Sequence, residues 1–456
     1  MTSERRMIAR HAGTVLAGQF AVMAFGVTDT IVAGRYAQDA LAALSVGSAI
    51  FISVFVALIG GLQALLPVWA ELHGARRQAE VGRSVRQALY LCGGAIAVGM
   101  AVLLMPGALL RWTAVPDTMR GDVEAYLAVL AFALPPALLF RLFSTLNQGL
   151  GKPKLVTWVQ MGALVLKVPL SIWFAFGGAG LPALGVVGCG WATLVVNWGM
   201  FALALWLLRT QAFYRVYGLW ARIEAPDWPQ LRRFARLGLP GSLSVLVEVT
   251  SFTLMALFIA RLGTAASAAH QIASNLTAVA YMVPLSLSIA TSARVSYWLG
   301  AGDATRARRA CARGFELTLG CALVVASAMA AARGWLADVY SDDPAVTTVA
   351  ATLLLATAGY HLADATQTLC VFVLRCYRVT VAPLVLYCAL LWGVGLGGSY
   401  LLAYRGLGPW TAMQSPLAFW LMGAAALLLT ALLFAALLWR TLRRARLPQP
   451  APPAHA

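Results

Sequence analysis

The chain has 456 residues, of which 61% are hydrophobic and only 11% are charged. A water-soluble domain needs about a quarter of its residues charged to cover its surface, so this composition excludes a soluble globular protein. The net charge of +17 does not indicate nucleic-acid binding. The basic residues sit in short clusters between long apolar runs, as they do in membrane-spanning chains.

Twelve apolar runs are each long enough to cross the bilayer core as a helix, which takes roughly 20 residues. They predict an all-α integral membrane protein of twelve transmembrane helices. In chain order the expected spans cover about residues 11–34, 42–70, 87–110, 125–150, 155–176, 184–208, 237–260, 266–298, 314–332, 345–374, 381–403 and 416–439.

The segments between these spans alternate in charge. Most of the 34 Lys and Arg residues lie in seven alternate segments, around residues 5–10, 76–86, 152–154, 209–236, 306–313, 375–378 and 440–446. The six intervening loops are poor in basic residues and carry most of the loop acids. Because Lys- and Arg-rich loops stay in the cytoplasm, both termini are expected to be cytoplasmic.

The longest basic segment divides the spans six and six. The expected organisation is an N-lobe over residues 1–210, a linker over 211–236, a C-lobe over 237–440 and a cytoplasmic tail over 441–456. The halves echo each other, because Trp69 precedes Gly74 and an arginine run, as Trp298 precedes Gly302 and another. Internal repeats of this kind are typical of transporters and predict two pseudo-symmetric six-helix bundles.

Six residues with charged side chains stand well inside the expected spans. Each costs several kcal/mol in a bilayer and therefore indicates a function or a partner. They are Asp29, Arg141, Lys167, Glu248, Arg294 and Asp364. The functional interpretation is that the three carboxylates face a water-filled cavity and bind a driving cation, H⁺ or Na⁺. The alternative is that Glu248 or Asp364 pairs with Arg294 or His361 and only holds helices together.

The other polar groups in the spans favour structural roles. Lys167 and Arg141 are interpreted as paired with acids or reaching toward the interface. His361 lies three residues before Asp364 on the same helix face and is interpreted as a satisfied packing group, with a proton relay as the alternative. The seven cysteines contain no CxxC pair, so neither a disulfide framework nor a zinc site is expected.

Several short segments form a recognisable set. In the first half they are residues 26–34 (GVTDTIVAG), 41–44 (LAAL) and 181–188 (LPALGVVG). In the second half they are residues 238–240 (GLP) before Glu248, 268–273 (AAHQIA), 281–285 (YMVPL), 362–367 (LADATQ) and 373–378 (VLRCYR). Taken together, these segments resemble the MATE family of multidrug exporters and in particular its NorM branch.

The resemblance implies a V-shaped pair of bundles that exports lipophilic, often cationic, drugs in exchange for Na⁺ or H⁺ by alternating access. It implies cation coupling at Glu248 and Asp364, both open to Na⁺, with a cation–π contribution from Tyr281. Asp29 matches an acid tied to proton or drug binding. Gln271 and Asp343 match positions that contact the drug. No resident cofactor is expected.

Two departures from the family pattern concern charge. Lys167 and Ser171 stand in span five where relatives often carry asparagines, and an ammonium there could neutralise Asp29. The usual acid after the VLRCYR segment is missing, since Val379 follows Arg378. A cation site in the first lobe is therefore in question.

Two other functions fit parts of the pattern. A lipid or polysaccharide-precursor flippase of related architecture would need a basic cavity and often has fourteen spans. A membrane-embedded acyl or glycosyl transferase would use His361 and Asp364, but the short loops lack the acidic or histidine clusters of such enzymes. We therefore expect a monomeric, non-enzymatic exporter in a bacterial inner membrane, whose partners are the bilayer, small-molecule drugs and organic cations.

Overall fold

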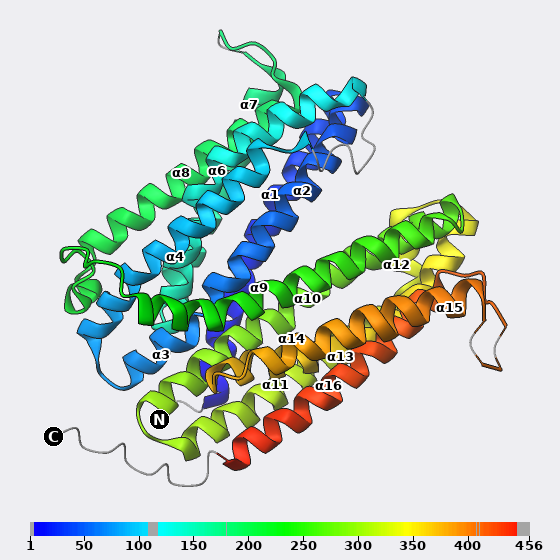
Figure 1. Cartoon of the computed structure of the whole chain (residues 1–456). Helices are drawn as coiled ribbons and strands as arrows, with labels where there is room; N and C mark the ends of the chain where they lie inside the picture. Colours follow the sequence, from blue (N-terminus) through cyan, green and yellow to red (C-terminus); the bar gives the residue numbers. More distant parts are fainter. Residues whose placement is uncertain (1–3, 108–116, 179, 407, 410, 445–456) are drawn as a thin grey trace. The chain divides into compact units, whose positions relative to one another are not determined.

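The computed structural model describes residues 4–107, 117–178, 180–406, 408–409 and 411–444 (Figure 1). Within this described part, twelve helices are long and apolar enough to cross a membrane, which confirms the expected number of spans. Helices suit this environment because hydrocarbon offers no partner to backbone N–H and C=O groups, and a helix pairs them internally. Apart from one isolated bridge between Gly178 and Leu181, the described residues contain no β-structure.

The first half of the chain forms spans one to seven. Its elements are α1 (Glu4–Tyr36), α2 (Gln38–Gln63), α3 (Leu66–Gly74), α4 (Gln78–Leu104), α6 (Asp117–Gly149), α7 (Pro153–Phe176), α8 (Gly185–Thr210), the 3₁₀ helix η1 (Ala212–Tyr217) and α9 (Trp228–Ala260). A turn at Ala64 and Leu65 separates α2 from α3, so span two is an interrupted helix.

The second half forms spans eight to twelve. Its elements are α10 (Thr264–Gly300), α11 (Ala304–Ala331), α12 (Arg333–Tyr340), α13 (Pro344–Cys376), α14 (Val381–Tyr387), η2 (Cys388–Gly397), α15 (Gly398–Tyr404) and α16 (Leu417–Arg444). The ten residues of η2 form a π-helix inside span eleven. Such wide turns are rare and are found mostly at functional sites.

The chain divides into two compact units. The N-unit comprises Gly13–Leu246, and the C-unit comprises Met1–Ala12 with Val247–Ala456. In the N-unit, span four (α6) packs against α2, α4 and α8. In the C-unit, span ten (α13) packs against α10, α11 and α16. The fourth span of each six-span set is thus central in its own unit.

Several helices begin earlier than the apolar runs predicted. The helix of span seven starts at Trp228 rather than near residue 237, and that of span nine starts at Ala304 rather than near residue 314. The additional turns carry arginines and are helical all the same. Hydropathy therefore locates the bilayer-crossing part of a helix and not its ends. Of the expected tail, residues 441–444 complete α16, and residues 445–456 lie outside the described part.

A tight helix crossing positions the beginning of α9. A Cβ atom added at Gly238 of α9 would lie 2.9 Å from the carbonyl oxygen of Gly61 in α2. A side chain at Gly61 would in turn meet the Ser242 hydroxyl at 2.9 Å. Glycines at such crossings let two helix backbones approach closely in a membrane. This contact fixes the turns of α9 that precede Glu248.

The segment between η1 and α9 is held on α4. The guanidinium of Arg86 donates to the Glu224 carboxylate, through Nε at 2.8 Å, and to the Gly218 carbonyl at 2.5 Å. The amide of Gln87 donates to the Ala225 carbonyl at 3.0 Å and accepts from the Asp227 backbone N–H at 2.8 Å. This part of the expected linker therefore has a defined conformation.

Candidate cation site and comparisons with known proteins

Glu248 lies in α9 and lines a small cavity within the C-unit. The cavity has a volume of about 40 Å³ and is also lined by Ser251 and Phe252 of α9, Tyr360 of α13 and Gly395 of η2. A space of this size holds water if polar groups line it. Its walls combine one carboxylate, hydroxyl oxygens and aromatic faces, all of which are groups that attract a cation.

Asp364 lies in α13 and is buried. Its Oδ1 accepts a hydrogen bond of 2.8 Å from Nε2 of Gln367, and the same Nε2 lies 3.2 Å from the Thr368 hydroxyl. The Tyr387 hydroxyl donates to the Gln367 carbonyl oxygen. Gln367 is therefore held from both ends of its amide, and it presents a donor to the carboxylate.

The structure brings Glu248, Asp364 and Tyr281 into one cluster. The two carboxylates are close enough to interact electrostatically, and both act on Tyr281. A buried arginine, Arg375 in the last turn of α13, also acts on Glu248. Within the described residues, no basic side chain comes within ion-pair distance of either carboxylate. The cluster therefore contains two acids and one more distant cation.

The alternative pairing with Arg294 or His361 is not observed. Arg294 forms a bidentate pair with Glu4, at 2.8 and 3.1 Å, inside the C-unit. The interpretation of His361 as a satisfied packing group was wrong. The imidazole is 1% exposed, and neither of its nitrogens has a hydrogen-bond partner among the described residues.

Asp29 lies apart from these residues, in α1 of the N-unit. The ammonium of Lys167 in α7 approaches Asp29 Oδ1 at 2.7 Å, and the Ser171 hydroxyl donates to the same oxygen at 3.0 Å. Lys167 also donates to the Thr193 hydroxyl at 2.7 Å and to the Cys189 carbonyl at 3.1 Å. The expectation that Lys167 neutralises Asp29 is confirmed. The paired carboxylate has no excess charge to offer a cation.

Arg141 in α6 differs from the expectation of an acidic partner. Its Nη2 donates to the Gln63 side-chain oxygen at 2.9 Å, and its Nε has no partner among the described residues. An amide satisfies part of the guanidinium but does not balance its charge. The sequence pattern did not indicate this pair, because Gln63 lies at the end of an apolar run.

The two expected drug-contacting residues lie away from the cluster along their helices. Gln271 is exposed near the start of α10, where its amide donates to Asn275 Oδ1 at 3.1 Å. Asp343 is exposed and caps α13, since its Oδ1 accepts from the Ala345 N–H at 2.9 Å. At 1.5 Å per residue, Asp343 is about 30 Å along the helix from Asp364. Neither residue shares the cavity of Glu248.

Three residues of the cluster were not singled out from the sequence. Tyr360 lines the cavity, and Tyr387 hydrogen-bonds to Gln367. Arg375 contributes the positive charge of the cluster. Arg375 was expected in a cytoplasmic loop because it begins a basic segment, but it is helical and buried. Helix spacing could have identified two of these residues, Tyr360 and Arg375. Tyr360 lies four residues before Asp364 and Arg375 lies eleven after it, so both share a helix face with Asp364.

Among the described residues, no group of three or more His, Cys, Asp or Glu side chains is arranged to hold a metal ion. A monovalent coupling ion does not need such a group. Two carboxylates with hydroxyl and carbonyl oxygens are enough for Na⁺, and a single carboxylate is enough for a proton.

Comparisons with known proteins cover nearly the whole chain. A curated protein of Aromatoleum aromaticum, "Probable multidrug resistance protein NorM", is 38% identical over 95% of this chain and 94% of its own length. "Multidrug resistance protein PmpM" of Pseudomonas aeruginosa is 34% identical over 90% of this chain and 85% of its own. The bent form of the MATE transporter VcmN of Vibrio cholerae has the same fold, with a TM-score of 0.84 at 18% identity over 97% and 98% of the two chains.

The MatE family model matches residues 15–173 and 240–401, which are more than half of the chain and include α9 from Pro240 to Glu248 and the whole of α13. Together with the NorM relative, this match shows that the protein is a multi-pass membrane transporter of the MatE (MATE) family, similar to its NorM members.

Proposed function

We propose that this chain is a multidrug efflux antiporter of a bacterial inner membrane, with both termini in the cytoplasm. It exports lipophilic, often cationic, compounds in exchange for H⁺ or Na⁺ by alternating access. The relatives named as multidrug resistance proteins support the transported class. The alternation of basic and non-basic segments supports the orientation.

The charge balance around Glu248 is the observation that carries this proposal. Two carboxylates and one arginine occupy the cluster, and no ion pair within the described residues neutralises either acid. With both acids ionised, the cluster has one excess negative charge. A single H⁺ or Na⁺ balances it, whereas a permanently empty site would leave that charge in a low-dielectric interior at a large cost.

Coupling requires that the cation and the drug stabilise different conformations of the transporter. The cavity beside Glu248 leaves room next to its carboxylate, and Asp364 supplies carboxylate oxygens nearby. Cation binding favours one conformation only if the site binds the ion more tightly there than in the other. We propose that the external cation favours the drug-accepting conformation, and that the bound drug favours return and release.

Glu248, Asp364 and Tyr281 are the proposed coupling residues, and Tyr360 joins them because it lines the cavity. Gln271 and Asp343 remain proposed drug contacts, since both are exposed and polar. Asp29 is proposed to contribute through its pair with Lys167 rather than as an open cation site. The transporter acts as a monomer and needs neither a catalytic residue nor a resident cofactor.

Transport by variants in inverted membrane vesicles tests the proposal. Glu248→Gln and Asp364→Asn keep side-chain size but remove the charge, so each is expected to abolish gradient-driven uptake of ethidium. Glu124→Gln, at an exposed acid paired with Arg120, is the matched control and is expected to transport normally. Varying the Na⁺ and pH gradients separately identifies the coupling ion.

Unchanged ethidium transport in both cluster variants would reject the assignment of the coupling site. Gradient-dependent movement of a fluorescent lipid without any ethidium transport would instead support the flippase alternative. Membrane abundance of each variant is measured in parallel, so that loss of transport is separated from loss of protein.

A further inference from the structure

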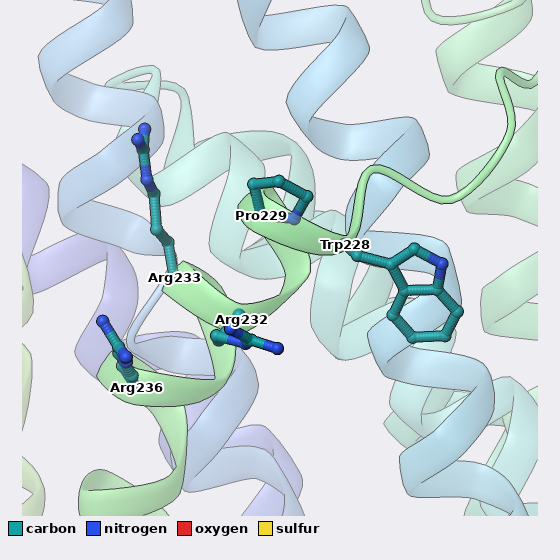
Figure 2. Close-up of a pocket in the computed structure, with 5 residues that line it drawn as sticks. All are labelled: Trp228, Pro229, Arg232, Arg233 and Arg236. Atoms are coloured by element: carbon teal, nitrogen blue, oxygen red, sulfur yellow. The ribbon is translucent and has the colours of Figure 1, made fainter.

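The first turns of α9 form a basic surface cavity that the transport cycle described above does not use. The cavity has a volume of about 300 Å³ and is lined by Trp228, Pro229, Arg232, Arg233 and Arg236. Figure 2 shows these side chains spreading from the first turns of the helix, with Arg232 between Trp228 and the other two arginines. The spacing of residues 229, 232, 233 and 236 places them on one helix face.

The acids nearest to these arginines in the sequence already have other partners. The Asp227 carboxylate lies 3.3 Å from Nη2 of Arg83, and its other oxygen accepts from the Gln230 N–H at 3.2 Å. The Glu224 carboxylate is held by Arg86. Among the described residues, Arg232 and Arg233 have no carboxylate within ion-pair distance. Their charges are therefore left for a group from outside the chain.

These arginines concentrate positive charge near the start of α9. Arg232, Arg233 and Arg236 all lie within the first nine residues of the helix. Asp227 caps the helix end through the Gln230 N–H, and its other oxygen faces Arg83. The cap therefore accounts for the helix end but not for the guanidinium groups of Arg232 and Arg233, which lie a turn further along.

Trp228 indicates what kind of anion the cavity fits. Its side chain is 72% exposed and it begins a helix that continues as a membrane span. Exposed tryptophans next to spans sit at the headgroup level of a bilayer, and arginine clusters beside spans bind anionic lipid headgroups. A small anion from solution has no apolar part that could pack against the indole.

We propose that this cavity binds the phosphate headgroup of an anionic phospholipid in the membrane leaflet next to the start of α9. The guanidinium groups of Arg232 and Arg233 contact the phosphate oxygens, for which their forked geometry is suited. Trp228 lies against the glycerol and upper acyl region. The lipid thereby anchors the beginning of the helix that carries Glu248 further along.

Native mass spectrometry of the full-length protein tests this site with phosphatidylglycerol as the probe. We expect Arg232→Gln/Arg233→Gln to lower the affinity for this lipid by about ten- to thirty-fold, the range expected for losing two interfacial arginine contacts. The matched control is Arg440→Gln/Arg444→Gln, which removes two exposed arginines from the last turns of α16. It is expected to bind phosphatidylglycerol like the unmodified protein.

Two further probes test which part of the lipid the site recognises. Dioleoylglycerol has the acyl chains without the phosphate and is expected not to compete, and inorganic phosphate is expected to compete only weakly. Equal loss of phosphatidylglycerol in both double variants would show general charge attraction and overturn the proposal. Strong competition by inorganic phosphate would show a site for a free anion and would overturn it as well. Elution volume and helical circular dichroism confirm that the variants are folded.

Discussion

The ammonium of Lys167 lies 2.7 Å from the carboxylate of Asp29, in the interior of the N-unit. The Lys167 side chain is 0% exposed and that of Asp29 10%. Ser171 and Thr193 complete the hydrogen bonding around the two charges. The pair joins α1 to α7 and makes Asp29 a very different acid from Glu248, which has no ion-pair partner among the described residues.

Breaking this pair is expected to destabilise the protein strongly. Lys167→Met leaves the Asp29 carboxylate buried without a counter-charge, which costs about 3–5 kcal/mol for a buried pair. Asp29→Asn/Lys167→Met removes both charges and should lose less. Unfolding by SDS in detergent micelles measures these free energies. If Lys167→Met is as stable as the unmodified protein, the pair contributes no stability.

Arg375 is expected to tune cation binding rather than to bind the cation itself. Arg375→Gln removes the positive charge that acts on Glu248 and leaves the two acids unopposed. The coupling ion should then bind about tenfold more tightly, because one charge interaction of roughly 1.4 kcal/mol changes a binding constant by that factor. Turnover should slow, since the ion leaves less readily.

Transport measured against external cation concentration tests this, with a lower half-saturating concentration and a lower maximal rate expected together. Arg378→Gln is the matched control, because Arg378 lies three residues further along and is exposed. An unchanged half-saturating concentration in Arg375→Gln would exclude Arg375 from the coupling site.

Asp343 can be tested with a variant that separates its two roles. Asn caps helices as well as Asp does, so Asp343→Asn should keep the start of α13 intact while it removes the charge. We expect slower efflux of cationic compounds and unchanged efflux of neutral ones, measured as dye accumulation in cells. Equal efflux of both classes would mean that Asp343 serves only as the helix cap. Asp343→Ala should additionally cost about 0.5–2 kcal/mol of stability.

The contact between Glu224 and Arg86 gives the segment before α9 a defined pH dependence. Hydrogen bonding from Arg86 lowers the pKa of Glu224 from 4.5 to about 2. Because the pKa is lower in the folded protein, the contact contributes fully above the ordinary pKa of a glutamate. The contribution is lost as the pH falls from about 4.5 to about 2.

A spin label at Ala221→Cys can follow this loss. Its mobility should be low at neutral pH and rise over that acidic range, whereas Glu224→Gln should be mobile at every pH. Glu80→Gln, at another exposed glutamate paired with an arginine, should behave like the unmodified protein. A label that stays equally immobile in Glu224→Gln would show that the Gln87 hydrogen bonds are enough to hold the segment.

The number of spans was predictable because bilayers impose simple rules on length and charge. Each span needs a long apolar run, and basic residues gather on one side. The helix ends were not predictable, because an arginine such as Arg306 can continue a helix beyond the hydrocarbon. The rules that count spans also misplaced Arg375, since they assign every basic cluster at a span end to a loop.

The acids of the site were predictable because carboxylates in apolar runs are costly, and Glu248 and Asp364 stood out for that reason. The residues that surround these two acids were harder to predict from the sequence. Arg294 pairs with Glu4, which is 290 residues away in the sequence, and no local pattern indicates such a partner. The pair of Asp29 and Lys167 was predictable only because charged residues are rare within spans. Which buried polar groups lack a partner in the described part of the chain, as His361 does, depends on packing.

The π-helix η2 forms part of the wall of the cavity beside Glu248, through Leu391 and Gly395. Its hydrogen bonds reach one residue further along the chain than those of an ordinary α-helix. Conversion of this stretch to regular α-helical bonding would turn Leu391 and Gly395 relative to the rest of the span. The volume open to a hydrated ion would then depend on the hydrogen bonding of these ten residues.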